Sequence, residues 1–130
     1  MRKLVYLCVI SSFVIIITSL FASCTDYKKD IVGWWISCDK NFNPERTGSY
    51  VYYIIREDGT YKIRRKGSFM GAEWDDTERG NWSISGSKIT FTDKKDGRTH
   101  KRQIEFIEKD KIIMIAYDSK DEEFYYVRYE

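Results

Sequence analysis

Few side chains in this sequence are of the kinds that perform chemistry, and they are scattered. The 130 residues include three cysteines and one histidine, His100. A general base needs a nucleophile or an acid beside it, and His100 is followed instead by Lys101 and Arg102, which predicts a surface position. The spacing motifs of serine hydrolases, zinc proteases, dithiol sites and phosphate loops do not occur. We therefore expect no enzyme and no catalytic residues, and a hydrolase built around His100 is the weakest alternative.

One acidic stretch of the chain contains Glu73, Asp75, Asp76 and Glu78. Carboxylate oxygens are the ligands that calcium prefers, so this cluster is the natural place to look for a metal site. Its spacing differs from the Asp-x-Asp-x-Asp-Gly pattern of known calcium loops. A solvated loop is the favoured interpretation, and we expect neither a metal nor a cofactor.

Basic residues cluster twice, and both clusters would suit anionic lipid headgroups or sugars. Charged hairpin edges that maintain solubility are the favoured interpretation. The whole chain has 22 basic and 20 acidic residues, for a net charge of +2. This balance argues against a nucleic-acid partner, which requires a positive face. The clusters are Lys62, Arg64, Arg65 and Lys66, then Lys94, Lys95, Arg98, His100, Lys101 and Arg102.

The N-terminal residues 1–23 form a segment of their own. Arg2 and Lys3 precede a long apolar run that ends in small residues, which is the pattern of an export signal. The run is nearly long enough to span a membrane, so an uncleaved anchor remains an alternative. In each case the basic start stays in the cytoplasm and the residues after 24 lie outside it.

Cys24 ends this segment, and the run Leu20-Phe21-Ala22-Ser23-Cys24 resembles a bacterial lipobox. Phe21 departs from the aliphatic residue usual at its position. The resemblance implies a diacylglycerol thioether on Cys24 and an acylated amine, and several acyl chains anchor a protein stably. We expect a lipid-anchored protein of the bacterial cell envelope, in the outer membrane, with a lean toward the periplasmic face because 25–30 carry mixed charge. Cys38 is then the one thiol of the folded domain, expected to be partly buried at a strand end.

The rest of the chain predicts an all-β domain over 31–130, joined to the anchor by a tether at 24–30. Short segments rich in β-branched and aromatic residues alternate with Gly and Asp turns. A turn of helix is expected only within 41–48 or 67–76. Hairpin-linked strands without a long crossover favour an eight-stranded antiparallel up-and-down barrel. The expected strands are 31–37, 48–56, 60–66, 79–84, 88–93, 99–107, 111–117 and 123–129, with the register open in the second, seventh and eighth.

Four segments in this order resemble the lipocalin-like domain of small bacterial lipoproteins: Gly33-Trp34-Trp35, REDGTYKI, RGNWSISGSKITFTD and the final YYVRYE. The resemblance covers about 31–129. It implies that Gly33 and Trp35 match the Gly-x-Trp motif, that Trp35 plugs the closed end of the barrel, and that Arg128 packs across it as a cation–π pair. The chain lacks the disulfide and the terminal helix of longer lipocalins.

Two functions remain open, because a small eight-stranded barrel has room only for its side chains or for one small ligand. In the first, the barrel binds or carries a small hydrophobic or amphipathic ligand. In the second, a solid barrel contacts or inhibits another envelope protein, with Trp74 in a charged loop as the anchor. The inward residues that would line a ligand site are Trp35, Tyr61, Ile63, Trp82, Ile84, Ile89 and Phe91.

Overall fold

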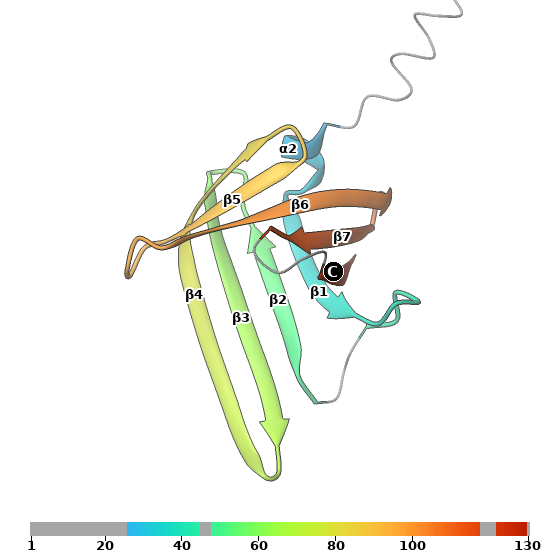
Figure 1. Ribbon diagram of the computed structural model, residues 1–130, viewed down its shortest axis with the longest axis vertical. Helices are drawn as coiled ribbons and strands as arrows, with labels where there is room; N and C mark the ends of the chain where they lie inside the picture. The colour runs from blue at the N-terminus through green and yellow to red at the C-terminus, as the bar shows by residue number, and fades with distance from the viewer. Residues whose placement is uncertain (1–25, 45–47, 118–121, 130) are drawn as a thin grey trace, which may run out of the picture.

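The computed structural model describes residues 26–44, 48–117 and 122–129. Eight antiparallel strands follow one another in chain order, and β8 pairs back onto β1 to close a barrel (Figure 1). This confirms the predicted all-β fold, while Cys24 and the export segment lie outside the described residues. Within the described ranges no helix has the length and apolar character needed to cross a membrane. The strands are β1 (Gly33–Cys38), β2 (Tyr50–Ile55), β3 (Thr60–Phe69), β4 (Ala72–Ser85), β5 (Lys88–Asp93), β6 (Thr99–Glu108), β7 (Lys111–Ala116) and β8 (Glu123–Arg128).

A single turn of helix, α2 (Tyr27–Asp30), precedes the barrel and covers one of its ends (Figure 1). This turn of helix lies within the tether predicted at 24–30, where no helix was expected. The Asp26 side chain accepts a hydrogen bond from the backbone N–H of Lys29, which caps the helix. Tyr27 also packs against Phe106, with 5.6 Å between the ring centroids. Because a cap and a core contact hold it, this segment is part of the folded domain.

The structure gives the register of β2, β7 and β8, which the sequence left open. In β2, Tyr53 and Ile55 lie in the core, and in β8 Tyr126 does. Val51 and Phe124, which share their faces, are partly buried against the same core. In β7 both faces are largely covered, since Ile112, Ile113 and Met114 are all buried. The period-two alternation therefore holds in β2 and β8 but does not describe β7.

The longest feature is the β3–β4 hairpin, which extends past its neighbours to a tip far from α2 (Figure 1). The structure contradicts the turn of helix expected within 67–76 and the solvated loop expected for the acidic cluster. The two strands pair from Thr60 with Asn81 to Phe69 with Ala72. This register sets the basic residues of β3 beside the acidic residues of β4, as in the Arg64–Asp75 ion pair at 2.9 Å. Cross-strand charge pairs stabilise such a hairpin.

Gly80 marks the point where β4 leaves β3 to pair with β5. The β4–β5 ladder runs from Gly80 with Asp93 to Ser85 with Lys88. A Cβ atom at Gly80 would overlap the backbone carbonyl oxygen of Thr92. The close approach of the two strands therefore requires glycine at this position.

Replacing Gly80 with alanine should lower the free energy of unfolding by about 3 kcal/mol, because the added methyl overlaps rigid backbone. Urea denaturation measures this change. The exposed Ser83 on the same strand is the control, and Ser83→Ala should change stability by less than about 0.5 kcal/mol. Equal effects of the two substitutions would contradict the proposed close approach.

Candidate functional site

The end of the barrel beneath α2 is closed by Trp35 and Arg128. Trp35 is fully buried, and its indole Nε1 donates to the backbone oxygen of Ile31 at 2.9 Å. The Arg128 guanidinium carbon lies 4.3 Å from the centroid of the Trp35 ring, which is the predicted cation–π contact. Arg128 also donates to the carbonyl oxygens of Val32 and Asp30, each at 3.0 Å. Arg128 of β8 thus joins Asp30 and Val32 to Trp35. Together these residues close this end of the barrel and form what we call its floor.

Gly33 belongs to the same floor. Its φ is +142°, and a Cβ atom there would overlap a guanidinium nitrogen of Arg128. Glycine is therefore required at this position for two reasons, conformation and space. The Gly-x-Trp spacing thus follows from the packing of Arg128 against Trp35.

Above the floor, aromatic rings fill the middle of the barrel. The Tyr61 and Phe91 rings are 4.8 Å apart between centroids, Tyr53 and Phe91 are 5.5 Å apart, and Tyr53 and Tyr126 are 5.2 Å apart. Of the residues predicted to line a ligand site, Ile84 is only partly buried against the core. The others are buried members of the core cluster: Trp35, Tyr61, Ile63, Trp82, Ile89 and Phe91.

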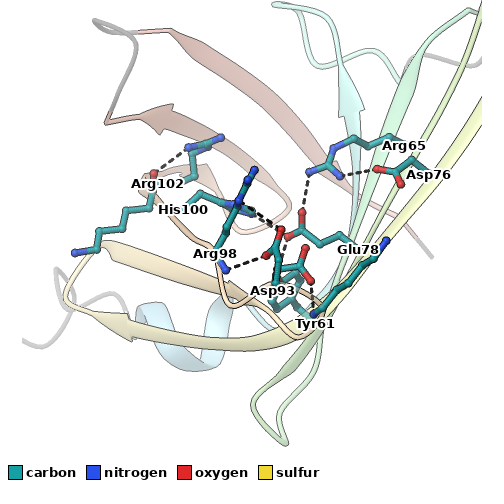
Figure 2. A network of polar contacts seen from close by, with 11 residues as sticks. Tyr61, Arg65, Asp76, Glu78, Asp93, Arg98, His100 and Arg102 are labelled. Atoms are coloured by element: carbon teal, nitrogen blue, oxygen red, sulfur yellow. Dashed lines mark hydrogen bonds and ion pairs between the residues drawn. The ribbon is translucent and has the colours of Figure 1, made fainter.

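A network of polar contacts surrounds the nearly buried Glu78 of β4 (Figure 2). The Tyr61 hydroxyl donates to Glu78 Oε2 at 2.7 Å, and Arg65 Nη2 lies 3.4 Å from Glu78 Oε1. His100 Nε2 lies 3.0 Å from Oε2. The Glu78 side chain is only 12% exposed, so three groups surround a nearly buried carboxylate. Charged groups in such surroundings interact more strongly than they do on a surface.

The prediction that His100 lies on the surface was wrong. Its ring packs against Phe91 with 5.8 Å between centroids, and its side chain is 25% exposed. The Nε2 atom is shielded from solvent and is close enough to Glu78 for an ion pair, yet it is not aligned for a hydrogen bond. Histidine alternates with Arg102 and the buried Ile104 on the inner face of β6, so strand geometry overrides the basic sequence around it.

Two arginines flank this polar interior. Arg65 pairs with Asp76 at 3.3 Å as well as with Glu78, so it is not part of the wet hairpin face on which we expected it. Arg102 lies beside His100 on β6 (Figure 2). The side chains of both arginines are only partly buried, so they can meet a molecule that enters from solvent.

Three tyrosine hydroxyls line the same interior. Burial raises the pKa of Tyr61, and its hydrogen bond to the Glu78 carboxylate raises it further. Burial likewise raises the pKa of Tyr53 and the pKa of Tyr126, whereas the positive charges of Arg102 and Arg65 act to lower both. All three groups are therefore neutral donors at physiological pH.

Trp74, expected in a loop, lies in β4 with its side chain 46% exposed. Its ring covers Gly67 on the facing strand, where a Cβ atom would overlap it. Both residues border a groove of about 480 Å³ that also includes Tyr50, Lys66 and Asp75. Trp74 is thus an exposed aromatic surface on the β3–β4 hairpin.

Cys38 lies at the end of β1, the predicted strand-end position, and it is buried there.

Sequence reasoning missed Tyr53 and Tyr126, and it favoured solvated positions for Arg65, Glu78 and Arg102. A signal was available in part, because Arg65 follows Ile63 at the inward spacing of two and Glu78 precedes Trp82 at a spacing of four. Charged residues at inward positions of barrel strands indicate either a solvent-filled opening or a binding site. The described residues contain no group of three or more His, Cys, Asp or Glu side chains able to hold a metal ion. No protein-family model matches the chain, and a search of curated proteins returns no match.

Proposed function

We propose that this protein is a membrane-anchored envelope lipoprotein whose lipocalin-like barrel binds or carries a small amphipathic ligand at its open end. The observation that supports it is the change in the inward face, from a sealed aromatic core at Trp35 to polar groups around Glu78. A barrel end that only faced water would not need charged side chains on its inner face. Convergent polar groups beside apolar walls are the usual composition of a small-molecule site.

The ligand is bound near the mouth rather than deep in the barrel. The aromatic contacts of Phe91 with Tyr53 and Tyr61 occupy the central part of the interior. The polar groups above them reach solvent, since Arg65 and His100 retain 34% and 25% side-chain exposure. We propose that this site binds its ligand without a catalytic step.

Equilibrium titration of the full chain with a panel of short amphiphiles, neutral and charged, tests this function. We expect saturable binding of at least one class that also protects the fold against heat, because a ligand bound only to the folded state stabilises it. A full panel that neither binds nor raises the melting temperature at millimolar concentration would reject the ligand-binding function.

Lipidation of Cys24 is tested separately. Cys24→Ser should move the protein from the membrane fraction to the soluble extract, or leave an unprocessed precursor, because the acyl chains supply the stable anchor. Fractionation with immunoblotting measures the outcome, and Cys38→Ser is the control that should stay membrane-bound. A Cys24→Ser protein of mature size in the membrane fraction would show that the lipobox interpretation is wrong.

A second function is favoured by the hairpin tip. Phe69 and Met70 are 73% and 92% exposed at the far end of the β3–β4 hairpin. Met70 has a φ of +51°, a conformation that methionine rarely adopts, at a turn where Asn-Gly would be less strained. An apolar tip on a protruding hairpin suits contact with another envelope protein. Crosslinking in intact cells tests it, and a pattern unchanged by Phe69→Ser with Met70→Ser would reject it.

A further inference from the structure

The helical turn α2 fixes the start of the folded domain close to Cys24. Asp26 caps this turn, and the backbone N–H of the buried Ile31 donates to the carbonyl oxygen of Tyr27 at 3.0 Å. Cys24 is two residues before Asp26, and two peptide steps span at most about 7 Å. A free tether of residues 24–30 would span up to about 25 Å. Folding of α2 therefore removes most of the distance between the proposed anchor and the barrel.

This short reach is comparable to the thickness of a lipid head-group layer. A bilayer is about 40–45 Å thick with its head groups and about 30 Å without them, so each head-group layer is about 5–8 Å deep. In the proposed lipoprotein the acyl chains on Cys24 enter the hydrocarbon, which holds Cys24 at its boundary. Asp26 then lies within the head-group layer or at its surface, and α2 follows directly.

Two exposed aromatic side chains lie on the outside of the barrel, next to its floor. Trp34 follows Gly33 and Tyr129 follows Arg128, and the two side chains are 49% and 44% exposed. The backbone N–H of Tyr129 donates to the carbonyl oxygen of Trp34 at 2.8 Å, and the stacked rings are 6.2 Å apart between centroids. Tryptophan and tyrosine favour the membrane–water interface, because each combines an apolar ring with a polar group. This pair therefore suits a surface that touches head groups.

The charges near α2 are of both signs. Lys28 and Lys29 are exposed on α2, and they border a groove that Asp26 and Glu57 also line. The lysines can reach lipid phosphates, while the carboxylates offset their attraction to an anionic membrane. Contact of this end with a bilayer therefore depends on the anchor and the aromatic pair, and zwitterionic lipid should suffice.

We infer that the floor end of the barrel lies against the bilayer, through α2, Trp34 and Tyr129, and that the β3–β4 hairpin points away from it. The inference rests on the proposed lipid anchor at Cys24 and names the surface that meets the head groups. Strand β3 starts at Thr60, after the turn that borders α2, and ends nine residues later at Phe69, about 30 Å along a strand. The hairpin tip is far from α2 (Figure 1). The exposed tip is thus presented to other envelope proteins rather than to lipid.

Quenching of tryptophan fluorescence tests the inference, with the full lipidated protein in phosphatidylcholine vesicles that carry a nitroxide on the head group. Trp34 and Trp74 are exposed to a similar extent, at 49% and 46%, whereas Trp35 and Trp82 are buried. We expect the vesicles to quench the unmodified protein, because the nitroxide acts only at short range. Trp34→Phe should reduce the quenched intensity at least twofold. The matched control is Trp74→Phe on the hairpin, which should leave the quenched intensity nearly unchanged.

Lysine acetylation measured by mass spectrometry provides a second readout that needs no substitution in the barrel. Lys28 and Lys29 should react at least threefold more slowly on vesicles than in the unanchored Cys24→Ser protein. Lys40, exposed beyond the opposite end of β1, should react equally in both.

The outcomes separate the orientation from the anchor. Quenching that depends on Trp74 as much as on Trp34, or equal protection of Lys40 and Lys28, would overturn the orientation and leave the lipid anchor intact. Failure of the unmodified protein to float with the vesicles would reject the anchor itself, and the orientation with it.

Discussion

Replacing Trp35 with alanine should lower the free energy of unfolding by about 4 kcal/mol. The side chain is fully buried, and its loss removes the Nε1 hydrogen bond to Ile31 and the ring beneath the Arg128 guanidinium. Arg128 would retain its bonds to backbone carbonyls but lose the surface on which it stacks. Small domains are stable by about 5–15 kcal/mol, so this single change removes a large share.

Trp34 is the matched control for this prediction. It is the adjacent residue and the same amino acid, but it is 49% exposed and stacks on Tyr129 on the outside of the barrel. Trp34→Ala should cost about 1 kcal/mol. Guanidinium denaturation of both variants measures the difference. A Trp34 effect as large as that of Trp35 would contradict the assignment of Trp35 as the floor of the barrel.

Alkaline pH should unfold the domain steeply. The pKa values of Tyr53, Tyr61 and Tyr126 are raised in the folded state, chiefly by burial, above the value of about 10 in an unfolded chain. The folded state therefore holds these three protons more tightly. The stabilisation is fully present below pH 10 and is lost as pH rises from there toward the folded-state pKa values. Each tyrosine removes about 1.4 kcal/mol per pH unit in that window.

Urea denaturation at a series of pH values from 8 to 11.5 measures this slope. Tyr53→Phe combined with Tyr126→Phe should reduce this slope, because two of the five tyrosines whose pKa is raised then carry no titrating proton. Tyr117→Phe, at a ring that is 45% exposed, is the control and should leave the slope unchanged. A slope that the double substitution does not alter would contradict the burial of these hydroxyls.

The barrel and its floor could be predicted because their signals are local. Turn residues recur between short strands, and alternation in β3, β4 and β5 identifies Tyr61, Trp82 and Phe91 as inward. The contact of Arg128 with Trp35 was predicted from a resemblance to a known pattern, and the geometry accounts for it through the packing of two strands that are adjacent in the closed barrel.

The polar mouth could not be predicted in the same way, because it depends on contacts between distant segments. Glu78 and His100 lie on β4 and β6, which are not paired with each other, and they meet across the intervening strand β5. The extra length of the β3–β4 hairpin depends on charge pairs such as Arg64 with Asp75, which a polar sequence does not distinguish from a loop. Similarly, α2 depends on the packing of Tyr27 against β6.

His100 provides the most direct test of a ligand site at the polar mouth. It is the only histidine of the chain, so its imidazole signals in a heteronuclear NMR spectrum form a single assigned reporter. Titration of the full chain with an amphiphile that binds should shift these signals progressively and saturably, because the ring lies in the proposed ligand site. Binding of the amphiphile with the His100 signals unmoved would contradict a ligand site at this end of the barrel.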